Sequence, residues 1–165
     1  MKPGTFVPLV ELLRAELGGY GGLLSLFDQQ QALLWRREVQ SVTETSHLIE
    51  ELASETAHHR RAREQWVARF AAEHEQPANS SLRALLPLFP AEQQPLLVAL
   101  IEEINHLLHR VRRRARQNHS ILTRAVELHR DALATLHPST RPRTYAPSGR
   151  LGSFADPAAT LRAAG

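Results

Sequence analysis

Residues 97–136 read LVALIEEINHLLHRVRRRARQNHSILTRAVELHRDALATL, and one heptad pattern runs through this whole stretch. With the first leucine at position a, apolar residues fill most a positions, and positions d and e add two neighbouring apolar columns. A stripe this wide is typical of a helix that packs against more than one neighbour. At 1.5 Å per residue, the helix would be about 60 Å long. Such a helix usually serves as a scaffold for other helices, which favours binding over catalysis.

The heptad positions identify the residues of this stripe. The a positions hold Leu97, Ile104, Val111, Asn118, Ala125 and Ala132. The d and e positions add Leu100, Ile101, Leu107, Leu108, Ala115, Ile121, Leu122, Leu128 and Leu136. Because a single polar residue at an a position can fix the register of neighbouring helices, Asn118 is expected to have that role.

The composition indicates one helical domain. The chain has 165 residues, only 5% of them aromatic, and it is rich in Leu, Ala, Glu, Gln and Arg, which favour helices. Cysteine is absent, which excludes disulfides and thiolate metal sites and suits the cytoplasm. Glu11 and Arg14 interrupt any signal-peptide core, and the longest apolar run, residues 96–101, is too short to cross a bilayer. We therefore expect a cytoplasmic protein without membrane insertion.

The charge distribution argues against nucleic-acid binding. The formal net charge is +3, and the segment from Pro138 onward contains four arginines and one aspartate, so residues 1–137 are neutral overall. The five arginines between Arg110 and Arg116 surround the predicted helix, because each residue turns it by about 100°. Since phosphate binding needs a continuous basic stripe, we expect no nucleic-acid partner.

Two further long helices precede this stretch. Apolar residues repeat every seven positions over residues 5–36 and resume, after a tight joint, over residues 39–75. The cluster Gly18–Gly22 interrupts the first pattern, and it indicates a kink, a close approach of two helices or plain local flexibility. Ser80 or Ser81 could cap a short helix over residues 80–86, and a third long helix is expected over residues 91–137.

These patterns predict an all-α fold, an elongated, coiled-coil-like antiparallel bundle of three long helices with a short helix between the second and third. A hairpin of the second and third long helices, folded near Leu86, would set residue 57 opposite residue 115. Both positions lie in polar segments, so we expect one shared polar layer, with Glu55 and Glu64 between the facing basic residues.

The chain changes character at Pro138. Residues 138–165 contain four prolines, several arginines and few large apolar residues, which cannot support a packed core. We expect a helical domain over residues 1–137 and a flexible, mobile C-terminal tail over residues 138–165. Tyr145, Leu151, Phe154 and Leu161 are scattered apolar residues in this tail and could serve as docking anchors.

The sequence offers little catalytic chemistry. Three Glu-x-x-His pairs, Glu44/His47, Glu55/His58 and Glu103/His106, have the spacing that di-iron bundles use. Such a site needs two pairs and two further glutamates from four helices, and only three long helices are predicted. No phosphate-binding loop and no nucleophile elbow is present. We therefore expect no enzyme, no cofactor and no metal, with a metal-binding helical bundle as the least favoured alternative.

Several segments, in this order, resemble the FlgN-type flagellar export chaperones: FDQQQALL, WRREVQSV, TSHLIEEL, NHSILTRAVELHRDAL and TYAPSGRLG. The resemblance covers most of the chain. It implies a cytoplasmic type III export chaperone that binds the C-terminal helices of flagellar hook–filament junction proteins. Such a chaperone prevents premature assembly of these proteins and delivers them to the export gate.

The resemblance also implies where partners bind. The C-terminal half of the third long helix would hold the substrate protein, and Tyr145 would contact the cytoplasmic domain of the export gate. The apolar stripe supports this independently, because a helix-binding chaperone needs apolar surface that its own bundle leaves partly uncovered. Taken singly, each stripe residue fits bundle core better than partner contact. A structural coiled-coil adaptor or self-assembling bundle, such as a homodimer, remains an alternative. The implied substrate-binding residues are Asn118, Ile121, Leu122, Ala125, Leu128 and Leu136.

Overall fold

A computed structural model describes residues 6–136, and helices account for nearly all of them. The elements are α1 (Phe6–Arg36), α2 (Val39–Glu73), α3 (Leu82–Leu85), the 3-10 helix η1 (Leu86–Leu88) and α4 (Gln94–Leu136). No strand occurs among residues 6–136. The predicted all-α class, with three long helices and a short one before the last, is therefore confirmed. The tail expected from Pro138 onward lies outside the described residues.

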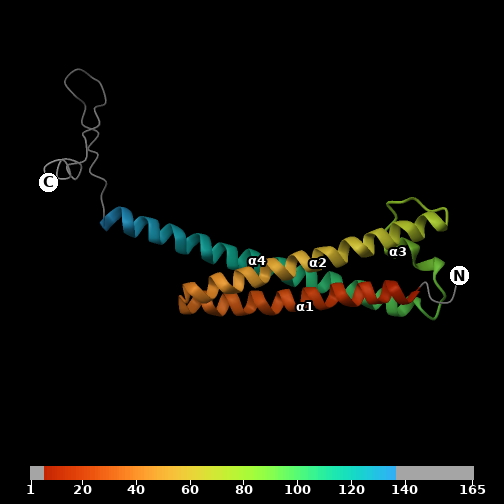
Figure 1. Ribbon diagram of the computed structural model, residues 1–165, viewed down its shortest axis with the longest axis horizontal. Helices are drawn as coiled ribbons and strands as arrows, with labels where there is room; N and C mark the ends of the chain where they lie inside the picture. Colours follow the sequence, from red (N-terminus) through yellow and green to blue (C-terminus); the bar gives the residue numbers. More distant parts are fainter. Residues whose placement is uncertain (1–5, 137–165) are drawn as a thin grey trace, which may run out of the picture. The chain divides into compact units, whose positions relative to one another are not determined.

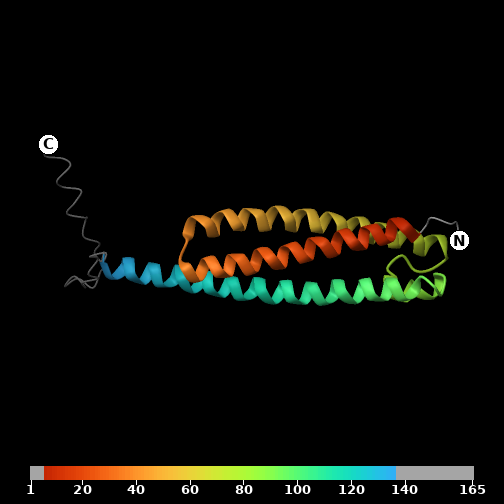
Figure 2. The same cartoon turned by 90° about the horizontal axis from the view of Figure 1, so that it is seen from below.

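The chain comprises two compact units, Met1–Thr123 and Arg124–Gly165, and the boundary between them falls within α4. In the first unit, α1 and the first part of α4 run in the same direction, and α2 runs antiparallel to both (Figures 1 and 2). The described part of the second unit is the last stretch of α4, which is helical as far as Leu136.

A tight joint connects α1 to α2. The amide of Glu38 donates to the carbonyl of Leu33 and the amide of Arg37 to that of Leu34, both over 3.2 Å. Arg37 has a φ of 59°, so this helix ends in a Schellman motif with a left-handed residue that is not glycine. The motif satisfies the last carbonyls of α1 and turns the chain directly into α2.

The helices α1 and α2 approach each other closely at two residues of the glycine cluster, Gly19 and Gly22. A Cβ atom added to Gly19 would clash with the side chain of Thr56, and one added to Gly22 would lie 2.8 Å from Leu52 Cδ2. A Cβ atom added to Gly18, in contrast, would have no atom of another residue within 4 Å. Helix α1 continues without a break through this region, and close approach of α2 accounts for Gly19 and Gly22 but not for Gly18 and Gly21.

Stacked aromatic rings close the end of the bundle where α2 finishes. The ring of Phe70 stacks on those of Trp66 and Phe89, with centroid distances of 5.1 and 4.6 Å. Ser81 caps α3, because its Oγ accepts a hydrogen bond of 3.2 Å from the amide of Ala84. Helix α4 then begins at Gln94. Pro95 is its second residue, where the missing amide proton costs no hydrogen bond.

The polar residues inside the bundle form two layers, so the predicted single layer at residues 57 and 115 is wrong. One layer is an ion pair between Arg63 and the buried Glu16, with 2.6 Å between Nε and Oε2. The other is a hydrogen-bond network around Asn118. Both layers are centred on α1, whose polar side chains the sequence pattern did not place.

The predicted interleaving of two glutamates with the basic residues of the third long helix is also wrong. Oε1 of Glu55 lies 3.7 Å from Nε2 of His59, and Oε1 of Glu64 lies 3.5 Å from Nε of Arg60. Each glutamate therefore contacts a residue of α2 itself. A residue four positions away on the same helix is always within reach, whereas a cross-helix partner depends on the register of the bundle.

Candidate partner-binding surface on α4

Burial decreases along α4 in a way that separates bundle core from candidate binding surface. The a-position residues Leu97, Ile104 and Val111 are buried against the other helices. Ile121 and Leu122 are half-buried, and most side chains after Thr123 are exposed. The first part of the apolar stripe is therefore core, and its later part faces solvent.

Asn118 lies on the core side of this transition, with only 1% of its surface exposed. Its Nδ2 donates to the carbonyl oxygen of Phe27 over 2.7 Å and to Oε1 of Gln30 over 2.9 Å. Its Oδ1 accepts a hydrogen bond of 3.2 Å from Gln31 Nε2. Asn118 is thus buried and bonded to α1, as the register-setting role predicted from its a position requires, and its amide is not available to a partner at the surface.

The remaining predicted substrate residues lie further along α4. Ala125 is half-buried, and Leu128 has 62% of its surface exposed. Leu136 is the last residue of α4, and its side chain lies outside the described part of the structure. Among the predicted residues whose side chains the structure describes, Leu128 therefore has the most accessible apolar surface.

Two exposed apolar residues of this region escaped the heptad analysis. Val126 and Leu133 are 48% and 59% exposed, and both occupy b positions, which sequence reasoning treats as solvent-facing. Their spacing of seven residues places them on one side of the helix, next to the e column. The repeated apolar residue at b was the signal that could have found them.

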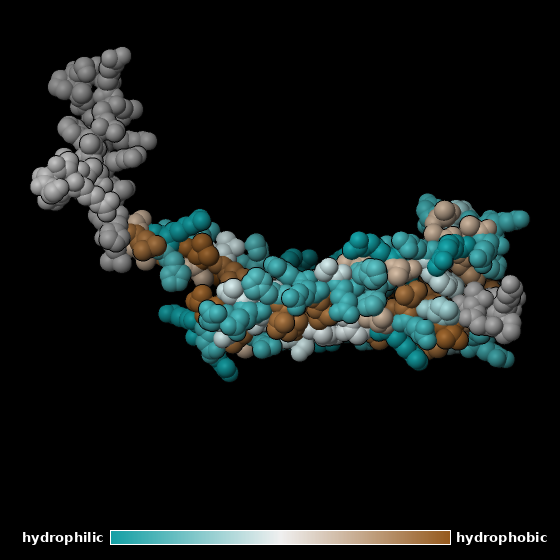
Figure 3. Space-filling view, in the orientation of Figure 1, coloured by the Kyte–Doolittle hydropathy of each residue, from teal (hydrophilic) through white to brown (hydrophobic). Residues whose placement is uncertain are grey.

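Together these side chains form an amphipathic helix face. At about 100° per residue, the apolar residues from Ile121 to Leu136, except Ala134, fall on one side of α4, while Arg124, Glu127 and Asp131 fall on the other. Figure 3 shows apolar residues, coloured brown, on the last described turns of α4. We call this side the apolar face of α4; its accessible members are Ile121, Leu122, Ala125, Val126, Leu128 and Leu133.

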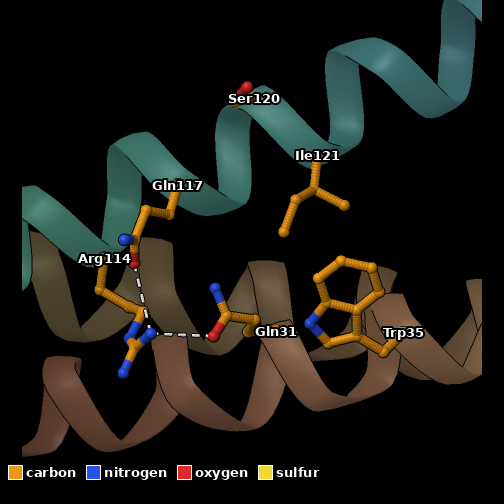
Figure 4. Close-up of a pocket in the computed structure, with 6 residues that line it drawn as sticks. All are labelled: Gln31, Trp35, Arg114, Gln117, Ser120 and Ile121. Atoms are coloured by element: carbon orange, nitrogen blue, oxygen red, sulfur yellow. Dashed lines mark hydrogen bonds between the residues drawn. The ribbon is translucent and has the colours of Figure 1, made fainter.

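A second feature is an open groove between α1 and α4 in the first compact unit. Its volume is about 410 Å³, and Figure 4 shows the Trp35 ring on α1 across from Ile121 on α4. Trp35 is 72% exposed, although the heptad pattern gave no reason to single it out. The groove is lined by Gln31, Trp35, Arg114, Gln117, Ser120 and Ile121.

Arg114 organises the polar side of this groove. Its guanidinium forms an ion pair of 2.5 Å with Asp28, and its Nη1 donates to Gln31 Oε1 over 2.9 Å and to Gln117 Oε1 over 3.3 Å. The contacts with Asp28 and Gln31 hold α4 to α1 next to the Asn118 network, and the contact with Gln117 lies within α4. Arg114 is thus a structural residue whose charge is already balanced.

The described residues offer no constellation for metal binding. Between residues 6 and 136, no three His, Asp or Glu side chains gather closely enough to hold a metal ion. In the same region, no helix is both long enough and apolar enough to cross a membrane.

Comparison with models of known protein families shows which family this chain belongs to. The family model described as FlgN protein matches residues 1–153, which include every described helix. The chain belongs to the FlgN family. The family implies a role as a flagellar export chaperone, and it is a family of chaperones and not of enzymes. No curated protein matches the chain, and no solved structure does either.

Proposed function

We propose that this FlgN-family protein is a cytoplasmic export chaperone that holds the C-terminal helices of flagellar hook–filament junction proteins on the apolar face of α4. The observation that supports the proposal most strongly is the exposure of Val126, Leu128 and Leu133 on one side of a regular helix. An amphipathic helix with an uncovered apolar side binds partner helices by burying that side.

The energetics favour such a partner. Each large apolar side chain that becomes fully buried contributes about 1.5–3 kcal/mol, before the cost of ordering the partner is subtracted. Three to five such side chains on the apolar face of α4 are enough for a specific but reversible complex. Reversibility suits a chaperone, which must release its cargo at the export gate.

Delivery requires a second contact, and we assign it to Tyr145. This residue lies outside the described residues, and the assignment rests on the resemblance of its TYAPSGRLG segment to the family. Because Tyr145 follows α4 in the chain, substrate binding and gate docking would use separate residues. The chaperone could then bind its cargo and the gate at the same time.

Isothermal titration calorimetry of the full chain tests the substrate assignment. The titrant is the C-terminal helical segment of a hook–filament junction protein from the same organism. Leu128→Glu places a charge in the apolar face and should weaken binding about tenfold or more, which corresponds to about 1.4 kcal/mol. Ala134→Glu adds the same charge opposite the centre of that face and should leave affinity within about twofold.

Two results contradict the proposal. The first is no heat of binding with the unmodified chain, which favours a structural adaptor. The second is equal affinity of the Leu128→Glu and Ala134→Glu variants, which would move the contact elsewhere. Circular dichroism of both variants checks that each retains its helix content.

A further inference from the structure

The groove beside Trp35 has apolar surface that the bundle leaves uncovered. A single exposed hydrophobic residue on a protein surface is unremarkable. Trp35, however, forms one wall of an open groove whose opposite wall is the half-buried Ile121. The groove volume of about 410 Å³ leaves room for a large side chain, since it falls within the range of about 300–1,000 Å³ found for small-molecule pockets. Tryptophan is also the residue type most enriched among those that dominate binding energy.

The polar groups of the groove favour a partner that accepts hydrogen bonds. The side-chain oxygens of Gln31 and Gln117 already accept from Arg114. Among residues 6–136, no hydrogen bond uses the side-chain NH2 of Gln117 or the indole N–H of Trp35. Figure 4 shows the indole nitrogen on the side of the ring that faces Gln31. The groove therefore presents N–H donors and few free acceptors.

The charge beside the groove also favours a partner that carries acceptor groups. Arg113 and Arg110 precede Gln117 by four and seven residues, so they share its side of α4. Both are exposed, and no carboxylate of the described residues lies within 4 Å of either. Asp28 is occupied by Arg114. This side of α4 is consequently positive and attracts a partner with negative charge.

From these contacts, and building on the function proposed above, we infer that the groove receives a large apolar side chain from an acidic amphipathic helix of the export substrate. Trp35 and Ile121 hold the apolar side chain, while Arg110 and Arg113 attract carboxylates on the same helix. The substrate helix is thus held by α1 as well as by α4. A second copy of this chain fits less well, because its residues 121–136 contain two arginines and two acidic residues and so have no net negative charge.

Matched pairs of variants test this inference by titration with the same junction-protein segment. Trp35→Ala should weaken binding about tenfold, whereas Leu48→Ala, which truncates another exposed apolar residue on α2, should leave it within about twofold. Arg110→Gln with Arg113→Gln should also weaken binding about tenfold. Arg112→Gln with Arg116→Gln removes the same charge from other sides of α4 and should have little effect.

Salt and fluorescence provide readouts that a folding defect would not reproduce. Raising NaCl from about 50 to about 300 mM should weaken binding of the unmodified chain more than that of the Arg110/Arg113 variant, because salt screens exposed charges. Trp35 and Trp66 are the two tryptophans of the chain. In a Trp66→Phe variant, emission from Trp35 should therefore shift to shorter wavelength when the segment binds.

The outcomes separate this inference from the function on which it rests. If Leu128→Glu abolishes binding while Trp35→Ala leaves affinity and salt dependence unchanged, the chaperone function stands and the groove assignment is wrong. If Trp35→Ala instead reduces self-association, measured by analytical ultracentrifugation, without changing substrate affinity, the groove pairs two copies of the chain and the inference is overturned.

Discussion

Asn118 on α4 and Gln30 on α1 form a buried amide pair, in which Asn118 Nδ2 donates to Gln30 Oε1 over 2.9 Å. Gln30 in turn donates from Nε2 to the Oγ of Ser46 on α2, also over 2.9 Å. One chain of hydrogen bonds therefore links the three long helices at a single level. Because buried polar groups need their partners, this pair opposes any shift of one helix along another.

Replacing Asn118 by alanine should destabilise the bundle by about 1–3 kcal/mol, because Gln30 Oε1 would be left buried without a donor and the Phe27 carbonyl would lose its second hydrogen bond. Chemical denaturation monitored by circular dichroism measures this change in the free energy of unfolding. His119→Ala alters the exposed neighbouring residue and is the control. A change below about 0.5 kcal/mol for Asn118→Ala would show that the network does not set the register.

The glycine cluster provides a second matched pair. Gly19→Ala should destabilise the protein by about 1–3 kcal/mol, because the new methyl group meets the stiff, β-branched side chain of Thr56. In Gly18→Ala the new methyl group meets no neighbouring atom, so the higher helix propensity of alanine should stabilise α1 by about 0.5–1 kcal/mol. Melting temperatures of the two variants should therefore move in opposite directions. A shift in the same direction for both would refute the close approach of α1 and α2 at Gly19.

Tyr20 makes stability depend on alkaline pH. Burial raises the pKa of its phenol above the ordinary value of 10.0, and the negative charge of Glu16 raises it further, against the opposing effect of Arg60 and Arg63. The folded state thus prefers the neutral phenol. This contribution to stability is complete below the ordinary pKa and is lost as pH rises through the higher pKa of the folded state.

Tyr20→Phe should consequently make the loss of stability between about pH 8 and about pH 11 shallower. Urea denaturation at a series of pH values measures the slope. Tyr145, the other tyrosine of the chain, lies outside the described bundle, so Tyr145→Phe is the control and should retain the slope of the unmodified chain. Equal slopes for Tyr20→Phe and the unmodified chain would contradict the assigned role of Tyr20.

Tyr145→Ala tests whether substrate binding and gate docking are separate. We expect unchanged affinity for the junction-protein segment and at least about tenfold weaker binding to the cytoplasmic domain of the export gate, since truncating an aromatic anchor commonly costs more than 1 kcal/mol. Biolayer interferometry with each partner immobilised in turn measures both affinities. Equal gate binding by the unmodified chain and the variant would remove Tyr145 from the docking contact.

The sequence predicted the elements well because each long helix repeats its apolar residues at the helical period. The expected boundaries at residues 36 and 39 agree with the end of α1 and the start of α2, and the expected start of the last helix at residue 91 lies three residues before Gln94. Ser81 likewise forms the cap that its position suggested. These features depend on local sequence, which is why pattern and capping rules found them.

The contacts between helices were less predictable, because they depend on the lengths of the joints and on the distance between helix axes. The ion pair of Glu16 with Arg63 joins residues 47 positions apart, and no periodic pattern in the sequence predicts it. Trp35 likewise gains its place in the groove only from the register that brings it beside Ile121. The face of α4 could be predicted from its sequence, whereas the groove required the packed bundle.

Hydrogen–deuterium exchange of the full chain, with and without the junction-protein segment, tests the central claim most directly, since it reports binding at each part of the helix. The account predicts slower exchange of amides in residues 121–136 when the segment is bound and unchanged exchange in the middle of α2, around residues 43–60. Protection confined to α2, or binding without any protection in residues 121–136, would contradict the claim that α4 holds the substrate.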